Sequence, residues 1–134
     1  MQLIIHTDGG SRGNPGPAAV GVVIDDGKSR VAEFGKRIGE TTNNVAEYRA
    51  VIEALRYIQT HTDIESVQFF LDSTLVVNQL NGIFRVKDAR LRGFLLDVRS
   101  LEQGIGKPIR YTAVPREQNS RADYWVNRAL DAGV

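Results

Sequence analysis

The chain has 134 residues, of which 42% are hydrophobic and 25% charged, and its formal net charge is +1. This length suits one folded domain with a substantial core, so we expect a single domain spanning residues 1–134. It has no cysteine, which excludes disulfides and thiolate metal sites. The first residues lack the basic stretch and apolar run of a signal peptide, and no apolar run is long enough to cross a membrane. We therefore expect a cytoplasmic protein with no membrane partner.

The charge is distributed unevenly along the chain. Residues 1–84 contain seven Lys or Arg and ten Asp or Glu, whereas residues 85–121 contain nine Lys or Arg and four Asp or Glu. An acidic first part followed by a basic flank suits a protein that binds cations and a polyphosphate backbone. Ordinary surface patches would produce the same pattern, so charge alone does not decide.

The first half of the chain is expected to form three strands and then a helix. Apolar alternation predicts strands at residues 3–8, 18–24 and 30–38. Asp25-Asp26-Gly27 is a hairpin turn signal between the second and third strands. A helix of about 16 residues follows from near Thr42, because apolar residues recur there with helical spacing.

The second half alternates strands with helices. Residues 66–71 form a short apolar strand suited to burial, and residues 73–80 a short helix capped by Ser73. Residues 88–103 form an amphipathic helix, residues 108–114 a last strand, and residues 119–131 a helix capped by Asn119 or Ser120. This order predicts an α/β fold with a mixed five-stranded sheet, antiparallel in its first three strands, and helices on both faces.

Four acidic residues occupy distinctive positions in this pattern. Asp8 and Asp72 end predicted strands, while Glu47 and Asp123 lie in the first turns of predicted helices. If folding brings the four together, their carboxylates cannot all stay charged without cations. Carboxylate oxygens are the ligands that Mg²⁺ prefers, and a pair of such ions can activate water and stabilise a leaving oxygen. The pattern therefore suggests phosphodiester hydrolysis.

Each acid also has a purely structural explanation. Asp8-Gly9 and Asn14-Pro15-Gly16 are ordinary turn sequences. Acidic residues in a first helical turn are favoured by the helix dipole, and a residue such as Asp72 at a strand end assists the cap of the next helix. Glu47 is less easily explained, because it lies beside the apolar stripe of its helix, where a carboxylate needs a partner or a cation.

Two other nucleotide or hydrolase signatures are excluded. Gly9, Ser11 and Gly13 match the nucleophile elbow of serine hydrolases, but that motif requires a helix where the chain continues as a strand. Neither His6 nor His61 has a carboxylate in an obvious partner position. No phosphate-binding P-loop sequence occurs.

Together the motifs resemble a known family. The resemblance to type 1 ribonuclease H rests on four segments in the family's order and spacing, namely Thr7-Asp8-Gly9-Gly10 with Gly13-Asn14-Pro15-Gly16, Asn43-Asn44-Val45-Ala46-Glu47, Asp72-Ser73 with Val76-Val77-Asn78, and Arg121-Ala122-Asp123. It covers essentially the whole chain and implies a ribonuclease H-like fold without a separate hybrid-binding domain.

The resemblance also implies an activity and a set of site residues. The activity is endonucleolytic cleavage of the RNA strand of RNA·DNA hybrids, leaving 3′-hydroxyl and 5′-phosphate ends. A monomer is the default expectation for the oligomeric state. Asp8, Glu47, Asp72 and Asp123 match the metal-binding and catalytic carboxylates, for two Mg²⁺ ions with substrate bound, and Mn²⁺ shares this ligand set. The residues implied to contact the hybrid are Gly9, Gly10, Ser11, Asn14, Thr42, Asn43, Asn44 and Thr74.

The chain departs from many family members at three places. The loop before Asp123 has no histidine and resembles the subgroup, including archaeal members, with arginine there, which makes Arg116 the candidate. Thr74 stands where relatives often have a glutamine that reads the minor groove. The segment between Gly82 and Leu91 is too short for a basic protrusion, so Arg85, Lys87, Arg90 and Arg92 would replace it in part. Because a separate hybrid-binding domain, found in some relatives, is also lacking, we expect modest affinity and low processivity.

Two alternatives remain open from the sequence. The chain could be a catalytically silent module that binds hybrid or structured nucleic acid. It could also be a nuclease of the same fold with another substrate, such as a resolvase-like enzyme or a 3′–5′ exonuclease. The four carboxylates favour an enzyme, and the Asn43-Asn44 pair with the Asn14 loop favours hybrids.

Overall fold

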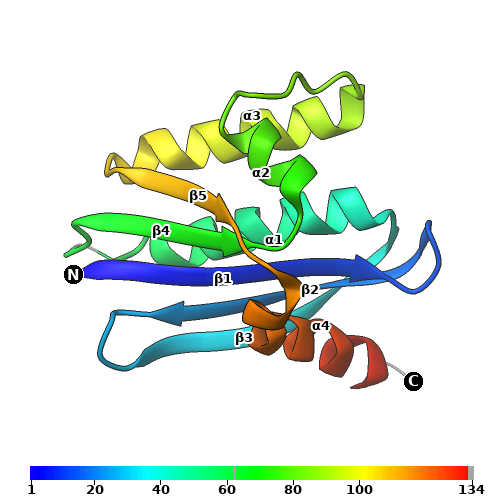
Figure 1. Ribbon diagram of the computed structural model, residues 1–134, viewed down its shortest axis with the longest axis horizontal. Helices are drawn as coiled ribbons and strands as arrows, with labels where there is room; N and C mark the ends of the chain where they lie inside the picture. Colours follow the sequence, from blue (N-terminus) through cyan, green and yellow to red (C-terminus); the bar gives the residue numbers. More distant parts are fainter. Residues whose placement is uncertain (62, 133–134) are drawn as a thin grey trace.

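A single five-stranded sheet organises the protein, with helices on both faces (Figure 1). The computed structural model describes residues 1–61 and 63–132. The strands are β1 (Gln2–Ser11), β2 (Gly16–Asp25), β3 (Arg30–Thr41), β4 (Ser66–Leu71) and β5 (Ile109–Ala113). The helices are α1 (Asn43–Ile58), α2 (Thr74–Leu80), α3 (Ala89–Ile105) and α4 (Ser120–Ala132), with a 3₁₀ turn, η1 (Arg116–Gln118), before α4.

The strands lie in the order β3-β2-β1-β4-β5. The β1–β2 and β2–β3 pairs are antiparallel, and the β1–β4 and β4–β5 pairs are parallel. This confirms the predicted fold class. Among the helices that the structure describes, none is long and apolar enough to span a membrane.

Each predicted strand and helix is present, but the first strands are longer than expected. The prediction ended the first strand at Asp8, whereas β1 continues to Ser11 and pairs there with Ala18 of β2. Glycines 9 and 10 lie within this paired stretch, so the glycine-rich sequence is partly strand and only partly loop. The η1 turn was not predicted.

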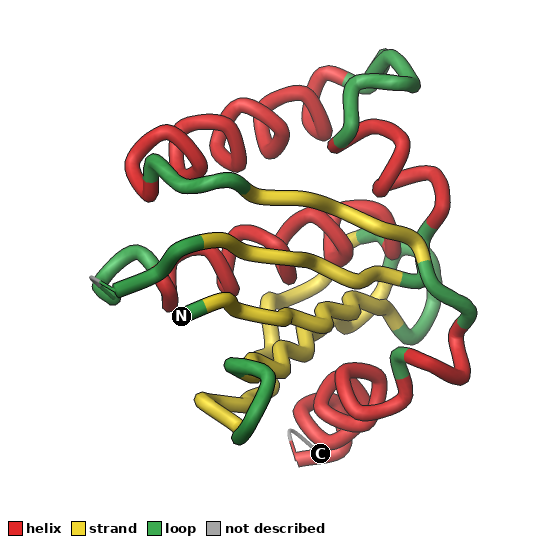
Figure 2. The backbone as a smooth tube through the Cα atoms, turned by 60° about the vertical axis from the view of Figure 1, so that its left-hand side comes forward, coloured by secondary structure: helices red, strands yellow, loops and turns green. Residues whose placement is uncertain are grey.

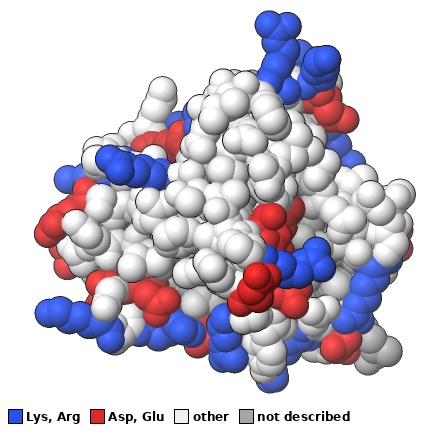
Figure 3. Space-filling model, in the orientation of Figure 1, with Lys and Arg blue, Asp and Glu red and all other residues white. Residues whose placement is uncertain are grey.

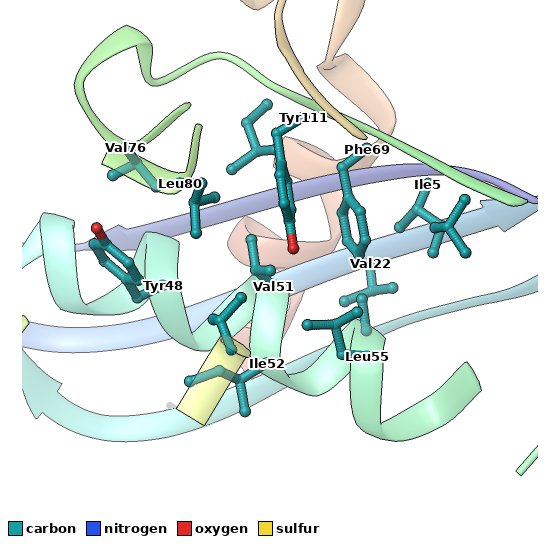
Figure 4. Close-up of a cluster of buried hydrophobic side chains, with 14 of the residues drawn as sticks. Ile5, Val22, Tyr48, Val51, Ile52, Leu55, Phe69, Val76, Leu80 and Tyr111 are labelled. Atoms are coloured by element: carbon teal, nitrogen blue, oxygen red, sulfur yellow. The ribbon is translucent and has the colours of Figure 1, made fainter. Parts of the chain in front are cut away.

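The main core lies between the sheet and α1, α2 and α3 (Figure 4). Helix α1 is almost entirely buried on its apolar stripe, which includes Tyr48, Val51 and Leu55. Leu55 lies near Phe69 of β4, whereas Tyr48 lies toward Leu80 of α2. Helix α4 packs on the opposite face against β1, β2 and β3 (Figure 2), around a small cluster of Ala19, Val126 and Leu130. Among the described residues, α4 therefore packs mainly on the sheet and is separated by it from the layer of α1, α2 and α3.

Helix α4 approaches the sheet closely because β2 has a glycine at the contact. A Cβ placed on Gly21 would lie 2.0 Å from the carbonyl oxygen of Ala122 in α4. The indole Nε1 of Trp125 also donates a 2.7 Å hydrogen bond to Glu33 on β3. These contacts fix the start of α4, where Asp123 lies.

We predict that Gly21→Ala destabilises the protein by about 1–3 kcal/mol, because the added methyl group overpacks the helix–sheet contact. The free energy of unfolding would be measured with urea. Gly93→Ala is the matched control, since a Cβ at this α3 position meets nothing within 4 Å. Its expected effect is a gain of roughly 0.5–1 kcal/mol from reduced chain entropy. Equal effects of the two substitutions would contradict the close contact.

Candidate active site

Two of the four acids are brought together by the contact between β1 and α1. Gly9 lies so close to α1 that a Cβ on it would be 2.2 Å from the carbonyl of Ala46. This approach lets the Gly9 N–H donate a 2.6 Å hydrogen bond to Oε1 of Glu47. Asp8 is the preceding residue on β1, and both carboxylates are buried, with 8% and 5% of their residues' surface exposed.

The parallel pairing of β1 and β4 adds the third acid. Parallel strands end at the same edge of a sheet, and Asp72 follows directly after β4. Ligand atoms of Asp8, Glu47 and Asp72 all lie within 4.8 Å of one another, and we call these three residues the carboxylate cluster.

Asp123 and Arg116 lie beside the carboxylate cluster on a small cleft. The cleft has a volume of about 200 Å³, and its lining residues are Asp8, Gly9, Gly10, Ser11, Arg12, Asn43, Arg116, Asp123, Val126, Asn127 and Leu130. Asp123 comes from the first turn of α4, and Asn127 donates a 3.3 Å hydrogen bond to its Oδ2. Near the middle of the face in Figure 3, red and blue side chains meet where β4 ends and η1 passes in Figure 1.

The cluster carries strong electrostatic repulsion. Burial raises the pKa of Asp8 to about 7, and the negative charges of Asp72 and Asp123 act in the same direction. Burial, followed by the charge of Asp8, also raises the pKa of Glu47 well above its usual range. The arrangement is therefore unfavourable for three ionised carboxylates by themselves.

The donor set fits divalent cations. Oε2 of Glu47 is buried and, within the described residues, has no hydrogen-bond partner. An unpaired buried carboxylate oxygen is costly unless a ligand satisfies it. Closely spaced carboxylate oxygens without sulfur or imidazole are the ligands that Mg²⁺ and Mn²⁺ accept.

Hydrogen bonds connect three polar residues near the cleft, Ser11, Asn14 and Asn43, which we call the loop system. Asn43 accepts hydrogen bonds at Oδ1 from the backbone N–H of Ser11 at 2.9 Å and from its hydroxyl at 3.2 Å. Asn14 accepts at its Oδ1 from the N–H of Asn43 at 2.9 Å. Because both amide oxygens are used inside the protein, the NH₂ groups of these exposed side chains are available as donors.

A second cavity of about 450 Å³ adjoins the cleft at Asn43. Its lining residues are Asn14, Thr42, Asn43, Asn44, Val45, Asp88, Arg90 and Leu91. Thr42 caps α1 by accepting a hydrogen bond from the N–H of Val45, so this cavity opens at a helix N-terminus. Of the predicted contact residues, Thr74 is exposed at the start of α2 and lines neither cavity.

The predicted cap of α4 is wrong for Asn119. The side chain of Asn119 does not accept from the helix; its Nδ2 donates to the carbonyl of Thr7 at 2.8 Å and to Oδ2 of Asp72 at 3.3 Å. The cap was predicted because asparagine directly before a helix commonly serves as the N-cap. Thr7 and Asp72 are both far from Asn119 in the sequence, so the local pattern did not indicate these contacts.

Comparison with known proteins assigns the chain to a family. A family model described as "Reverse transcriptase-like" matches residues 6–129. The crystal structure of RNase H1 from the halophilic archaeon Halobacterium salinarum superposes with a TM-score of 0.92 at 42% identity, covering 98% of this chain and 99% of that one. The chain belongs to the ribonuclease H1 family. Another ribonuclease H1, LC11, solved in complex with an RNA/DNA hybrid, has a TM-score of 0.91 at 42% identity, covering 98% of both chains.

Some ribonuclease H relatives are much longer than this chain. A bifunctional protein of Mycobacterium tuberculosis is 40% identical over 136 aligned residues, which cover 100% of this chain but 37% of that protein. The chain thus spans little more than a third of the length of this curated relative.

We predict that Asp8→Asn stabilises the protein in EDTA, because it removes one charge from the buried cluster. Each unit of raised pKa corresponds to about 1.4 kcal/mol against the ionised form, so a gain of roughly 1–3 kcal/mol is expected at pH 8. The free energy of unfolding in urea would be compared with that of Asp97→Asn, an exposed α3 control expected to change little. Destabilisation by Asp8→Asn would show that favourable contacts of Asp8 outweigh the repulsion.

Proposed function

We propose that the protein is an endonuclease that hydrolyses the RNA strand of RNA·DNA hybrids and leaves 3′-hydroxyl and 5′-phosphate ends. The observation that carries this proposal is the carboxylate cluster, with ligand atoms within 4.8 Å, beside a cleft lined by exposed amides. Support comes from LC11 ribonuclease H1, which matches the chain over 98% of its length and was solved with an RNA/DNA hybrid.

Asp8, Glu47, Asp72 and Asp123 would hold two divalent cations, Mg²⁺ in the first instance, with Mn²⁺ able to use the same oxygens. When bound, such ions activate a water and stabilise the leaving oxygen of a phosphodiester. The protein's own contribution is orientation. The Gly9 N–H fixes Oε1 of Glu47, which leaves the buried Oε2 for a cation.

The loop system would select the hybrid. Discrimination of RNA from DNA requires hydrogen bonds to the 2′-hydroxyl, and the NH₂ groups of Asn14 and Asn43 can donate to it. Gly9, Gly10 and Ser11 let the backbone approach the RNA strand beside the carboxylate cluster.

The other strand of the hybrid would be held by the second cavity. Thr42 and Asn44, at the N-terminus of α1, suit a phosphate of the DNA strand. Thr74 is proposed to contact the hybrid from the start of α2, with a shorter reach than a glutamine.

Arg116 is proposed to act on phosphate and not as a base. A guanidinium has only N–H donors and no acceptor, so an arginine does not act as a general base. It lines the same cleft as Asp8 and Asp123 from the exposed η1 turn, where a cationic side chain can stabilise charge on the phosphate or assist product release.

We further propose that the chain works as a monomer of one domain in the cytoplasm. The strands that the structure describes share one sheet, and the helices of both faces pack on that sheet. The basic residues after α2 are exposed (Arg85, Lys87, Arg90 and Arg92). They would add attraction for a nucleic-acid backbone.

The test uses an RNA·DNA hybrid with labelled RNA, incubated with the protein in Mg²⁺ and separately in excess EDTA. Single-stranded RNA and duplex DNA are run alongside. Internal cutting of the RNA strand of the hybrid alone, and only in Mg²⁺, supports the proposal. Binding without cutting would indicate a silent binding module, and cutting of another substrate would indicate a different nuclease of this fold.

We predict that Asp8→Asn abolishes hybrid cleavage and leaves hybrid binding intact or tighter. The substitution weakens cation binding but removes no contact of the loop system. Cleavage would be followed on gels and binding by fluorescence anisotropy, with Asp97→Asn as the control that also detects contaminating nuclease. Retained cleavage by Asp8→Asn would refute the two-cation assignment.

We predict that Arg116→Ala lowers kcat by about tenfold, equivalent to about 1.4 kcal/mol of barrier, which is far less than a carboxylate substitution costs. Arg116→Lys keeps the positive charge and should retain intermediate activity. Steady-state kinetics on the hybrid would measure both. A loss as large as that of Asp8→Asn would mean that Arg116 has a more direct role.

A further inference from the structure

We propose that Asn119 is a positioning residue that sets the orientation of the Asp72 carboxylate and thereby the cation affinity of the site. This inference rests on the proposed function. Asn119 is 1% exposed, and its side chain contacts Thr7 within β1 and Asp72, the residue that follows β4.

The contacts of Asn119 specify an amide nitrogen. One partner is the backbone carbonyl of Thr7 and the other is Oδ2 of Asp72, and a carbonyl and an ionised carboxylate are both acceptors. An asparagine NH₂ group has two hydrogens, one for each acceptor. No hydroxyl can serve both at once, because it has a single hydrogen.

The backbone of Asn119 connects the remaining site residues. Its carbonyl accepts a 3.2 Å hydrogen bond from the N–H of Asp123, and its N–H donates a 2.9 Å hydrogen bond to the carbonyl of Arg116. Thr7 is the neighbour of Asp8. One buried residue therefore contacts Asp72, Asp123 and Arg116 directly and Asp8 through its adjacent residue.

A role in capping or filling space does not explain this geometry. A helix cap would use Oδ1 as an acceptor, yet Oδ1 of Asn119 is buried and has no partner among the described residues. The side chain thus gives both its donors to Thr7 and Asp72 and leaves its acceptor unsatisfied. The free-energy cost of this unpaired buried oxygen is explained if the protein requires a fixed orientation of the Asp72 carboxylate.

Asn119 acts on the side chain of Asp72, because the backbone there is already held. The N–H of Val114 donates a 2.8 Å hydrogen bond to the carbonyl of Leu71, and Ser73 caps α2 by accepting from the N–H of Val76. Without the Asn119 amide, the half-buried carboxylate of Asp72 would be free to rotate on this fixed backbone. The three ligand oxygens would then no longer be held together.

The experiment compares Asn119→Ala with Asn81→Ala. Asn81 is a matched control, since its Nδ2 also donates to a backbone carbonyl, that of Tyr111 at 3.1 Å, but it contacts no acid of the site. We expect the Mg²⁺ concentration for half-maximal cleavage to rise about 10- to 100-fold in Asn119→Ala only, as is typical when a residue that orients a metal ligand is lost. At saturating Mg²⁺, KM for the hybrid should stay unchanged.

A second readout does not depend on cleavage. Mn²⁺ should raise the melting temperature of the wild-type protein and of Asn81→Ala, and the concentration required should be higher for Asn119→Ala. Asn119→Ser, which keeps one donor, should be intermediate in both readouts, and it replaces Asn119→Ala if that variant does not fold.

Wild-type Mg²⁺ and Mn²⁺ dependence in Asn119→Ala would overturn the inference. So would an equal change in Asn81→Ala, which would indicate a general effect of lost stability. If the wild-type protein binds Mn²⁺ but does not cleave the hybrid, the proposed function fails. In that case a weaker Mn²⁺ response of Asn119→Ala alone still supports the positioning role.

Discussion

The parallel pairing of β1 and β4 at the centre of the sheet is the constraint on which the site depends. Parallel neighbours must be joined by a crossover, and α1 provides it by passing over one face of the sheet. The same crossover delivers Glu47 to Gly9, while the common edge of the two strands places Asp72 near Asp8. Three carboxylates from distant parts of the chain thus meet because of one topological feature.

The remaining candidate site residues come from the face of the sheet opposite α1. Helix α4 contributes Asp123, and the η1 turn before it contributes Arg116 to the same cleft. Since α4 contacts the sheet and not α1 or α3 to any large extent, the two halves of the site belong to separately packed layers. Asn119 joins them, with its side chain between β1 and Asp72 and its backbone in the approach to α4.

The sequence predicted the strands and helices well because their signals are local. Alternation in the strands, helical spacing in α1 and Ser73 as the cap of α2 all depend on neighbouring residues. The acids were found because each lies in a recognisable motif, and their roles remain predictions. Asn119 was one of two predicted caps of α4, and its actual side-chain role was missed because its partners lie 112 and 47 residues away in the chain. Such pairings arise only from the tertiary fold.

The close approach at Gly9 links the core and the site in a way that limits how the protein can change. Any side chain at this position would collide with the backbone of α1 at Ala46, and the helix would have to move away from β1. The same movement would lengthen the hydrogen bond to Glu47. A substitution at position 9 therefore changes the packing of α1 and the position of Glu47 together.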